Sequence, residues 1–534
     1  MKGTHSWIRR AAFAGLLAAP ALVVPRVADA FCGFYVAGGD ARLYNNATVV
    51  VMLRDGTRTV LSMQNNYQGP PQDFAMVVPV PVILKEKDVK TLPREIFDTV
   101  DLLAAPRLVE YWEEDPCKPL IKYKPMAKGG GGAIPDPTAV DDVEKHGVKI
   151  EAQFTVGEYQ ILILSAQEAT GLDAWLRENK YTIPAGAAEV LRPYVQAGMK
   201  FFVAKVDPSK VTFGPNGQAM LSPLRFHYDS ETFNLPVRLG LLNSAGAQDL
   251  IVHIVARSRY ELANYPNVTI PTNIEVKDGV RESFGQFYVS LFDATLAQNP
   301  KAVVTEYAWM ANNCDPCPVQ PLQVEELVTL GADVLPSVGQ IDDSQRWSLP
   351  GEFVLTRLHA RYGKENLGED LVFREASGIV GGREVLAGEK VEQGPSPSSV
   401  NNFQARYIIR HLWEGAVLCL RPKFGRWGGP PAGKSGSQQP AVARDLAFAD
   451  RTGSLSTYVA QDIPEIRLTM AAGEAPPVQP TGPVTPGIPV TVPPTRAATP
   501  GAAAGGGCGC AVDERGAGWL LLGLAAPGLR RRRR

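Results

Sequence analysis

The sequence predicts an α+β fold with mixed, mostly antiparallel sheets built from hairpins, a few packed helices and a disordered Pro-rich stalk. Apolar, β-branched runs at 47–53 and 59–63 flank Asp55-Gly56, which is a strong hairpin signal because both central residues of such a turn need positive φ. Strand and helix patterns follow without a steady strand–helix–strand alternation, which favours α+β over a doubly wound sheet. The stretch 474–507 is rich in Pro, Ala, Thr and Gly and cannot form a core.

The first half of the chain continues with strands and one well-marked helix. Residues 74–80 read as a third strand, with Pro79 at an edge or an end. Apolar and polar residues alternate over 148–155, which predicts a half-buried strand, and 159–164 returns as a strand buried on both faces. Residues 165–168 form a capping box that opens a helix. The apolar stripe of that helix comprises Ala169, Leu172, Trp175 and Leu176.

The second half repeats this mixture. A second short helix is expected over 187–194, limited by Pro193, because proline removes a helical hydrogen bond. Further expected strands are 201–206, 250–256, 303–309, 353–362 and 403–413, and further expected helices are 283–297 and 322–330.

Both ends of the chain carry export features. Lys2, Arg9 and Arg10 precede an apolar run, and a small-x-small site ends at Ala30, so residues 1–30 read as a secretory signal peptide. The exported globular region is then 31–470, with a subdomain break near the Gly- and Pro-rich stretch 126–142. A Pro/Ala/Gly-rich linker follows at 471–506, and a C-terminal tail at 507–534.

The tail has three ordered parts. Gly507-Cys508-Gly509-Cys510 is followed by an apolar stretch at 516–529 and by terminal arginines at 530–534. The arginines would stay on the cytoplasmic side of a membrane. The apolar stretch is shorter than the roughly 20 residues of a comfortable span, which indicates a transient stop signal. The alternative is an ordinary single-pass transmembrane anchor.

This order of parts resembles the myxobacterial C-terminal sorting tail called MYXO-CTERM. The resemblance implies processing by a sorting protease near Cys508 and Cys510, after which the protein stays on the cell surface. The expected location is therefore the cell envelope at its outer surface. The expected partners are the export machinery, that protease, the membrane through the tail, and cell-surface polysaccharide or another envelope protein.

Composition agrees with a secreted globular protein. Hydrophobic residues make up 45% of the 534 residues and charged residues 20%, which is ample for a packed core. The formal net charge is -1, so bulk electrostatics favour no nucleic-acid partner.

Cysteines supply the sharpest chemical motif. Outside the tail the chain has Cys32, Cys117, Cys314, Cys317 and Cys419, an odd number in a compartment that permits disulfides. The pair Cys314 and Cys317 follows an expected strand and precedes an expected helix, which is the context of a thioredoxin-type redox site. Pro318 and Pro321 delay that helix, so a structural disulfide is favoured and redox chemistry is the alternative.

Several segments resemble the domain-of-unknown-function family 2330 of exported bacterial proteins. They are 31–36 (Phe-Cys-Gly-Phe-Tyr-Val), 66–69, 73–81, 105–111 and 314–317 (Cys-Asp-Pro-Cys). The resemblance covers 31 to about 420 and implies no known activity. No catalytic residue, metal site or cofactor is expected, because no histidine stands at metal-ligand spacing from another histidine or a cysteine.

A set of cations follows strand alternation. Arg357, His359 and Arg361 share one face of the strand at 353–362, and Arg406 and Arg410 share one face of the strand at 403–413. If these strands are neighbours, the cations form an outward strip that binds phosphate or acidic glycans. The alternative is pairing with Glu369, Asp370 or Glu375.

These observations predict an exported, surface-displayed protein with a structural or binding role. The alternative is an extracytoplasmic thiol-disulfide oxidoreductase that uses Cys314 and Cys317.

Overall fold

The central sheet grows from a hairpin near the start of the chain. Strands β2 (Thr48–Asp55) and β3 (Arg58–Met63) pair antiparallel, which confirms the predicted hairpin. The last pair is Asp55 with Arg58, so the central residues of the turn are Gly56 and Thr57. Of these two only Gly56 has positive φ (58°), the conformation that glycine adopts at no steric cost.

The computed structural model describes the chain with gaps. The described residues are 34–35, 48–64, 75–118, 143–145, 147–179, 181, 183, 185–213, 219–242, 248–339, 343–363, 367–384, 386–387, 390–392, 394–430, 440–443, 451 and 453–470. The expected signal peptide, the break at 126–142, the linker and the tail, with Ala30, Cys32, Cys508 and Cys510, lie outside these ranges.

The central sheet contains the strands that matter for the site. Beyond β2, in order, come β15 (Gln248–Ala256), β20 (Val354–Tyr362), β19 (Val303–Met310), β26 (Asn402–Gln404), β22 (Ile379–Gly381) and β25 (Ser396–Pro397). Beyond β3 come β13 (Leu224–Asp229) and β5 (Val89–Thr91), and β17 (Asn267–Thr269) pairs with β19. The β15–β2 pair is parallel.

A second, wholly antiparallel sheet packs on the central sheet. Its order is β1 (Phe34–Tyr35), β4 (Ala75–Val80), β10 (Lys200–Val206), β9 (Tyr159–Ala166), β8 (Val148–Val156) and β7 (Val143–Lys145). Side chains such as Ile161 and Phe202 from this sheet meet Leu61 and Val252 from the central sheet in one buried apolar cluster. Burial of this apolar surface holds the two sheets together.

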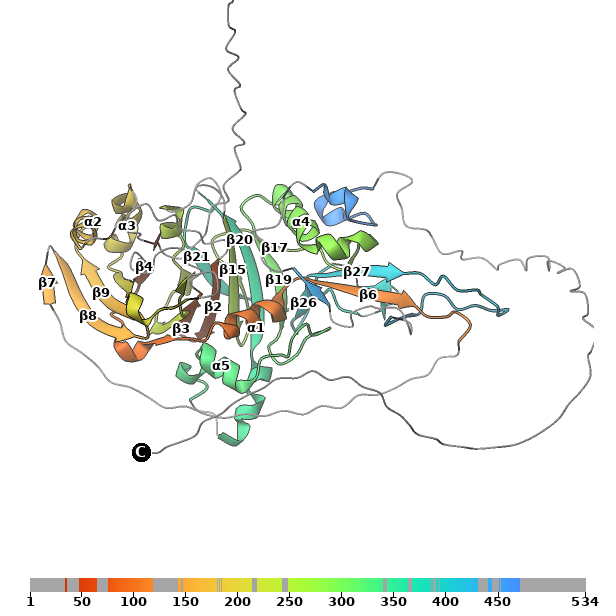
Figure 1. The fold of residues 1–534 in the computed structure, drawn as a ribbon, viewed down its shortest axis with the longest axis horizontal. Helices are drawn as coiled ribbons and strands as arrows, with labels where there is room; N and C mark the ends of the chain where they lie inside the picture. The colour runs from red at the N-terminus through yellow and green to blue at the C-terminus, as the bar shows by residue number, and fades with distance from the viewer. Residues whose placement is uncertain are drawn as a thin grey trace, which may run out of the picture. The chain divides into compact units, whose positions relative to one another are not determined.

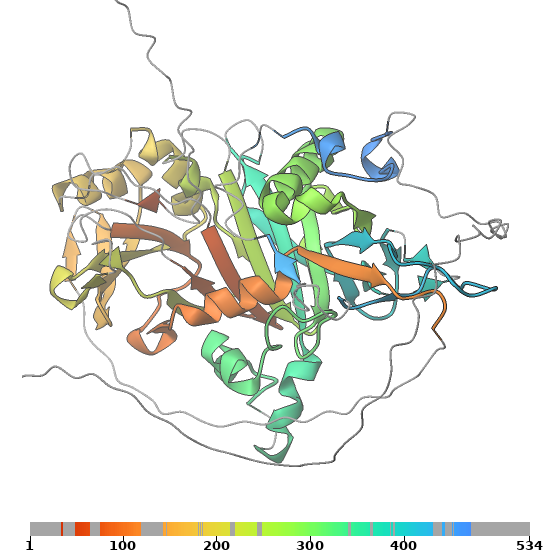
Figure 2. The same ribbon diagram turned by 45° about the vertical axis from the view of Figure 1, so that its right-hand side comes forward.

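Helices cover the outer faces of these two sheets, so the sheets and their helices form four layers (Figures 1 and 2). Helices α2 (Ala169–Glu178) and α3 (Ala187–Gln196) cover the second sheet. On the far face of the central sheet lie α1 (Glu95–Ala104) and α5 (Val324–Leu330). Helix α4 (Phe284–Gln298) packs against β19 and against a third sheet.

The third sheet corrects one prediction. The expected strand 403–413 is broken at Ala405 into β26, in the central sheet, and β27 (Arg406–His411), in the third sheet. There β27 runs parallel to β6 (Arg107–Glu113). The remaining strands of this sheet are β18 (Ile274–Glu275), β28 (Trp427–Gly428) and β29 (Ala441–Val442).

The small sheets contain β14 (Asn234–Leu235), β21 (Leu371–Ala376) and β16 (Arg259–Leu262), then β11 (Thr212–Phe213) with β12 (Ala219–Met220), and β23 (Leu386–Ala387) with β24 (Lys390–Val391).

Most local predictions are confirmed, with three differences. The predicted stripe of α2 is its buried face, but Ser165 lies inside β9 and bonds Glu151, so it does not cap the helix. Pro193 lies within α3 and does not end it. Gln160 is exposed, so β9 is not buried on both faces there.

Mixed, mostly antiparallel sheets with few helices make the described part α+β. Among the described residues, no helix is long and apolar enough to cross a bilayer.

Candidate functional site

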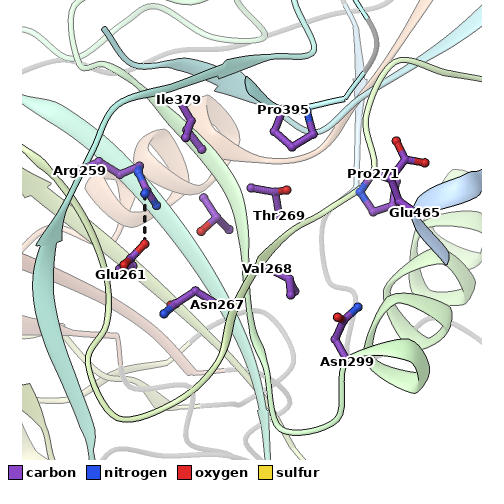
Figure 3. Close-up of a pocket in the computed structure, with 11 residues that line it drawn as sticks. Arg259, Glu261, Asn267, Val268, Thr269, Pro271, Asn299, Ile379, Pro395 and Glu465 are labelled. Atoms are coloured by element: carbon purple, nitrogen blue, oxygen red, sulfur yellow. Dashed lines mark hydrogen bonds and ion pairs between the residues drawn. The ribbon is translucent and has the colours of Figure 1, made fainter. Parts of the chain in front are cut away.

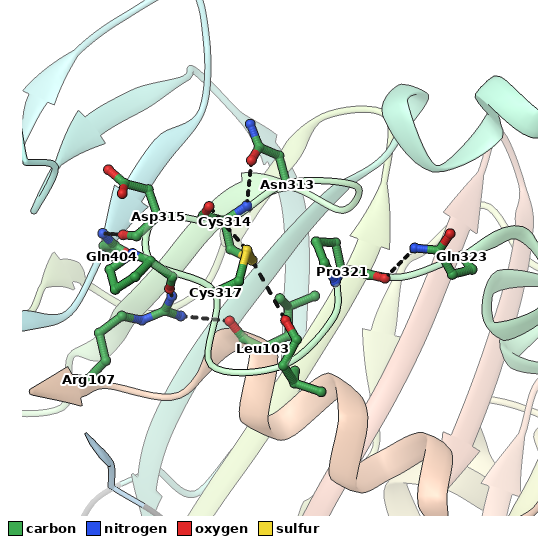
Figure 4. The surroundings of a disulfide bond; sticks show 11 residues. Leu103, Arg107, Asn313, Cys314, Asp315, Cys317, Pro321, Gln323 and Gln404 are labelled. Atoms are coloured by element: carbon green, nitrogen blue, oxygen red, sulfur yellow. Dashed lines mark hydrogen bonds between the residues drawn. A yellow bond between two sulfur atoms is a disulfide. The ribbon is translucent and has the colours of Figure 1, made fainter. Parts of the chain in front are cut away.

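The pair Cys314 and Cys317 forms a disulfide at a turn after β19 (Figure 4). Arg107 lies beneath this turn, and its guanidinium donates to the carbonyls of Pro316 (2.8 Å) and Leu103 (2.6 Å). Gln404 donates to the carbonyl of Asp315. The backbone of the turn is therefore bound to β6 and β26, and Arg107 connects it to the end of α1.

This geometry differs from a thioredoxin-type site in two respects. Cys314 is buried in the apolar cluster under α1 and α5, and Cys317 is exposed, whereas the attacking thiol of a redox motif must be accessible and activated. Helix α5 begins only at Val324, so its N-terminus is not placed to stabilise a thiolate at Cys314. The arrangement serves a structural disulfide.

A second disulfide joins Cys117, after β6, to Cys419, after β27, with Cα atoms 5.6 Å apart. The sequence left this pairing open. The two cysteines are 302 residues apart in the sequence, so the bond joins an early and a late segment of the chain at the end of the third sheet.

The predicted cationic strip does not face outward as a unit. Arg357 and His359 share a face of β20, as the alternation predicts, but they are only 2% and 1% exposed. Arg406 and Arg410 lie in the third sheet, on β27, which is not a neighbour of β20. The physical reason is the strand break at Ala405, which separates the two sets.

Each cation of the predicted strip already has protein partners. Buried Arg406 donates to Asn273 (3.1 Å) and Tyr111, and burial followed by repulsion from Arg107 and Arg410 lowers its pKa to about 10. Arg410 lies 3.5 Å from Glu275 and over the ring of Trp427. Glu369, Asp370 and Glu375 are not the carboxylates that pair with the strip; Glu369, for example, pairs with Arg238.

The carboxylates that pair with β20 come from elsewhere, and the key one is Glu306. The register of β19 against β20 shifts between Thr305 and Tyr307, which makes Glu306 the extra residue of a β-bulge. A bulge re-aims a side chain, and here the carboxylate reaches Arg357 Nε (2.6 Å) and His359 Nδ1 (2.6 Å). The hydroxyl of Tyr288 on α4 donates to the same carboxylate.

On either side of Glu306, acidic and basic side chains alternate along this face of β20. On one side Arg357 donates to Asp101 of α1. On the other side His359 lies 3.5 Å from Asp249, which accepts from Arg361 Nε (2.9 Å). Arg361 and Arg451 both contact Asp249 and Asp293. We call this set the charge network: Asp101, Arg357, Glu306, His359, Asp249, Arg361, Arg451 and Asp293. Its centre is buried, and Arg451 at its outer end is exposed.

Charge balance in the network favours the protonated form of His359. The set holds the carboxylates Asp101, Glu306, Asp249 and Asp293 against the guanidiniums of Arg357, Arg361 and Arg451. Burial alone would lower the pKa of His359, but Glu306 and Asp249 outweigh it and raise that pKa. For the carboxylate of Glu306 burial acts in the other direction and would raise the pKa, but His359 and Arg357 hold that pKa at about 2. The ring of Phe292 stacks on His359, with centroids 3.8 Å apart.

His253 lies beside the network, but its pKa is shifted downward, opposite to that of His359. It is fully buried on β15, 3.3 Å from Arg357 Nη1. Burial, and then repulsion from Arg357, lower its pKa to about 3, so it is neutral.

We expect the two histidines to give opposite pH dependences of stability. The pKa of His359 is raised above 6.5, so its contribution is present below pH 6.5 and is lost as pH rises through its folded pKa. The pKa of His253 is depressed, so its contribution is present above pH 6.5 and is lost as pH falls towards 3. Urea unfolding should show that His359→Asn costs more at pH 6 than at about pH 9, and that His253→Asn costs less in acid. The same cost at every pH for both variants would contradict this assignment.

One protein-family model matches more than half of the chain. Residues 26–374 match the family model described as "Uncharacterized protein conserved in bacteria (DUF2330)". The chain belongs to the DUF2330 family. The match ends at 374 and not near 420, so β27 and Cys419 of this DUF2330 protein lie beyond it. No curated protein and no solved structure matched the chain.

The charge network lies mostly within the DUF2330 region, and the sequence reading missed its acids. Asp101, Asp249, Asp293 and Glu306 come from four different elements, α1, β15, α4 and β19, of which only α4 and β19 are consecutive in the sequence. One signal was available: Glu306 is the single charged residue of the otherwise apolar strand β19, and a buried charge requires a partner.

A pocket of about 370 Å³ opens beside β17, still largely within the DUF2330 region (Figure 3). Its polar wall contains Arg259, which donates to the carbonyl of Ser377 (2.8 Å) and to Glu261 (3.1 Å). Burial lowers the pKa of Arg259. Glu465, which is exposed, lies across the pocket from Arg259, and Ile379 and Pro395 line the side between them (Figure 3). Thr269 and Asn299 add further hydrogen-bonding groups, so the pocket can hold a small polar molecule with an apolar edge.

Metal ligation has no candidate among the residues that the structure describes. They contain no group of three or more His, Cys, Asp or Glu side chains with the spacing to hold an ion.

Proposed function

We propose that this DUF2330 protein is exported and displayed on the outer surface of a bacterial cell, where it has a structural or binding role. The observation that carries the proposal is the pair of disulfides, Cys117–Cys419 and Cys314–Cys317, in the described part of the chain. Disulfides persist in oxidising compartments outside the cytosol. The signal-peptide pattern ending at Ala30 supports the same compartment.

Surface retention rests on the C-terminal tail. Its Cys508 and Cys510, apolar stretch and terminal arginines support a MYXO-CTERM-type sorting signal that a protease processes. The proposed partners are the export machinery, that protease, and cell-surface polysaccharide or another envelope protein. The pocket beside β17 supports a polysaccharide, because Arg259, Glu261 and Thr269 are groups that hydrogen-bond sugar hydroxyls.

A second candidate function is an extracytoplasmic thiol-disulfide oxidoreductase. One observation favours it: Cys317 is exposed, so a partner thiol can reach its sulfur. Its buried partner Cys314 and the distant helix start weigh against it.

Mass spectrometry of the native protein under non-reducing conditions tests the proposal. We expect an N-terminus at Phe31, loss of Arg530–Arg534, and both disulfides intact, because a signal peptidase, a sorting protease and an oxidising compartment each leave one of these marks. Recovery of the whole arginine tail from the cell surface would contradict sorting and favour a plain anchor. Free thiols at Cys117 and Cys419 would contradict export.

A further inference from the structure

The end of the third sheet carries an apolar tip that the proposed function does not use. We define the tip as residues 116–118 and 417–423, the chain on either side of the Cys117–Cys419 disulfide. Leu418 is 90% exposed and Leu420 is 96% exposed, and Val417 beside them is also exposed. Leucines so completely exposed next to each other mark an interaction site.

The tip is held in place, so its exposure is a property of the fold. The disulfide fixes Cys419 against the end of β6. The amide of Lys423 donates to the carbonyl of Pro116 (2.9 Å). Arg426 donates to the carbonyls of Lys118 (2.6 Å) and Asp115 (2.5 Å). Figure 1 shows the chain after β27 running outward past the end of β6, away from the helices.

The charged residues of the tip are all cations. Lys118, Arg421 and Lys423 are exposed, and the tip contains no Asp or Glu. Two acids of the adjoining chain are engaged behind it: Asp115 accepts from the amide of Cys117 (2.9 Å), and Glu113 accepts from the amides of Trp413 (3.1 Å) and Gly425 (2.7 Å). Glu114 and Glu414 are exposed but precede the tip along the chain. The outermost surface therefore combines leucines with a positive rim.

We propose that this tip inserts into the surface of a membrane that contains anionic lipid headgroups. The leucines enter the boundary between headgroups and acyl chains, and Lys118, Arg421 and Lys423 contact the lipid phosphates. The complementary charge favours a membrane over an apolar protein groove. The tip is also far smaller than the roughly 20–30 residues a side of a stable protein interface, but it suits shallow insertion.

The test uses the full-length chain with a photoreactive diazirine amino acid in place of Leu420, so that the readout is local to the tip. Vesicles of phosphatidylglycerol and phosphatidylcholine should give covalent lipid adducts. Vesicles of phosphatidylcholine alone should give at least about tenfold fewer, because each exposed cation contributes to binding an anionic surface. The variant Lys118→Gln/Arg421→Gln/Lys423→Gln should show the same loss on anionic vesicles.

A matched control places the same diazirine amino acid at Trp347, which is 70% exposed but lies beside α5, and should give no lipid adduct. Mass spectrometry should find the Cys117–Cys419 bond in every variant, which shows that the tip has formed. Adducts with a second copy of the chain, equal lipid adducts from the control position, or equal yields on neutral vesicles would each overturn the proposal.

Discussion

Replacing Glu306 with glutamine should lower the free energy of unfolding by about 3–5 kcal/mol, the cost of removing one partner from a buried ion pair. The amide preserves the shape of the side chain but leaves Arg357 and His359 buried without their shared charge. Urea unfolding followed by circular dichroism measures the loss. The pKa of His359 should fall as well, because Glu306 is the main group that raises it.

The matched control is Glu352→Gln, which removes the same charge from an exposed pair with Arg257. Exposed pairs contribute roughly 0–1 kcal/mol, so this variant should unfold almost like the parent. Equal losses in the two variants would show that the burial of Glu306 adds nothing. A Glu306→Gln loss below about 1 kcal/mol would mean that Asp101 and Asp249 satisfy the two cations alone.

Removing the two disulfides should have very different costs. In the loop-entropy model, a bond that closes a loop of about three hundred residues stabilises by about 5–6 kcal/mol, whereas one that closes a very short loop contributes about 1–2 kcal/mol. The variant Cys117→Ser/Cys419→Ser, with a separation of 302 residues, should therefore melt far earlier than Cys314→Ser/Cys317→Ser, with a separation of 3.

The same pair of variants separates a structural role from redox chemistry at Cys314–Cys317. If the bond is structural, the isolated protein does not reduce or oxidise a test substrate, and its bond resists exchange with glutathione. Rapid exchange at Cys317, together with an activity that Cys314→Ser/Cys317→Ser abolishes, would support the oxidoreductase. Equal melting temperatures for the two double variants would contradict the loop-length argument.

Local pattern was enough to predict most elements of this fold, because their signals lie within a few residues. The first hairpin and the stripe of α2 are of this kind, although the central residues of the turn are Gly56 and Thr57 and not the predicted Asp55 and Gly56. The break at Ala405 was not predictable, since apolar alternation continues across it and only the division between two sheets imposes it.

For the site, alternation placed Arg357, His359 and Arg361 on one face correctly, but it carried no information about what covers that face. The covering acids come from α1, α4, β15 and a bulge of β19, so their meeting is decided by tertiary structure. A face of arginines on a strand is as consistent with a buried ion network as with an exposed strip. The lone Glu306 in an apolar strand was the sequence feature that distinguished the two.

The strand order has a consequence for the timing of folding. Strand β2 pairs in parallel with β15, about two hundred residues later, and β6 pairs in parallel with β27, nearly three hundred residues later. Strand β2 therefore lacks a partner on one side, and β6 on both sides, until the late strands have been synthesised. Such non-local pairing makes folding slow and leaves strand edges open in the meantime. For the export proposed above, this connectivity means that β2 and β6 lack their parallel partners until the late strands have been synthesised.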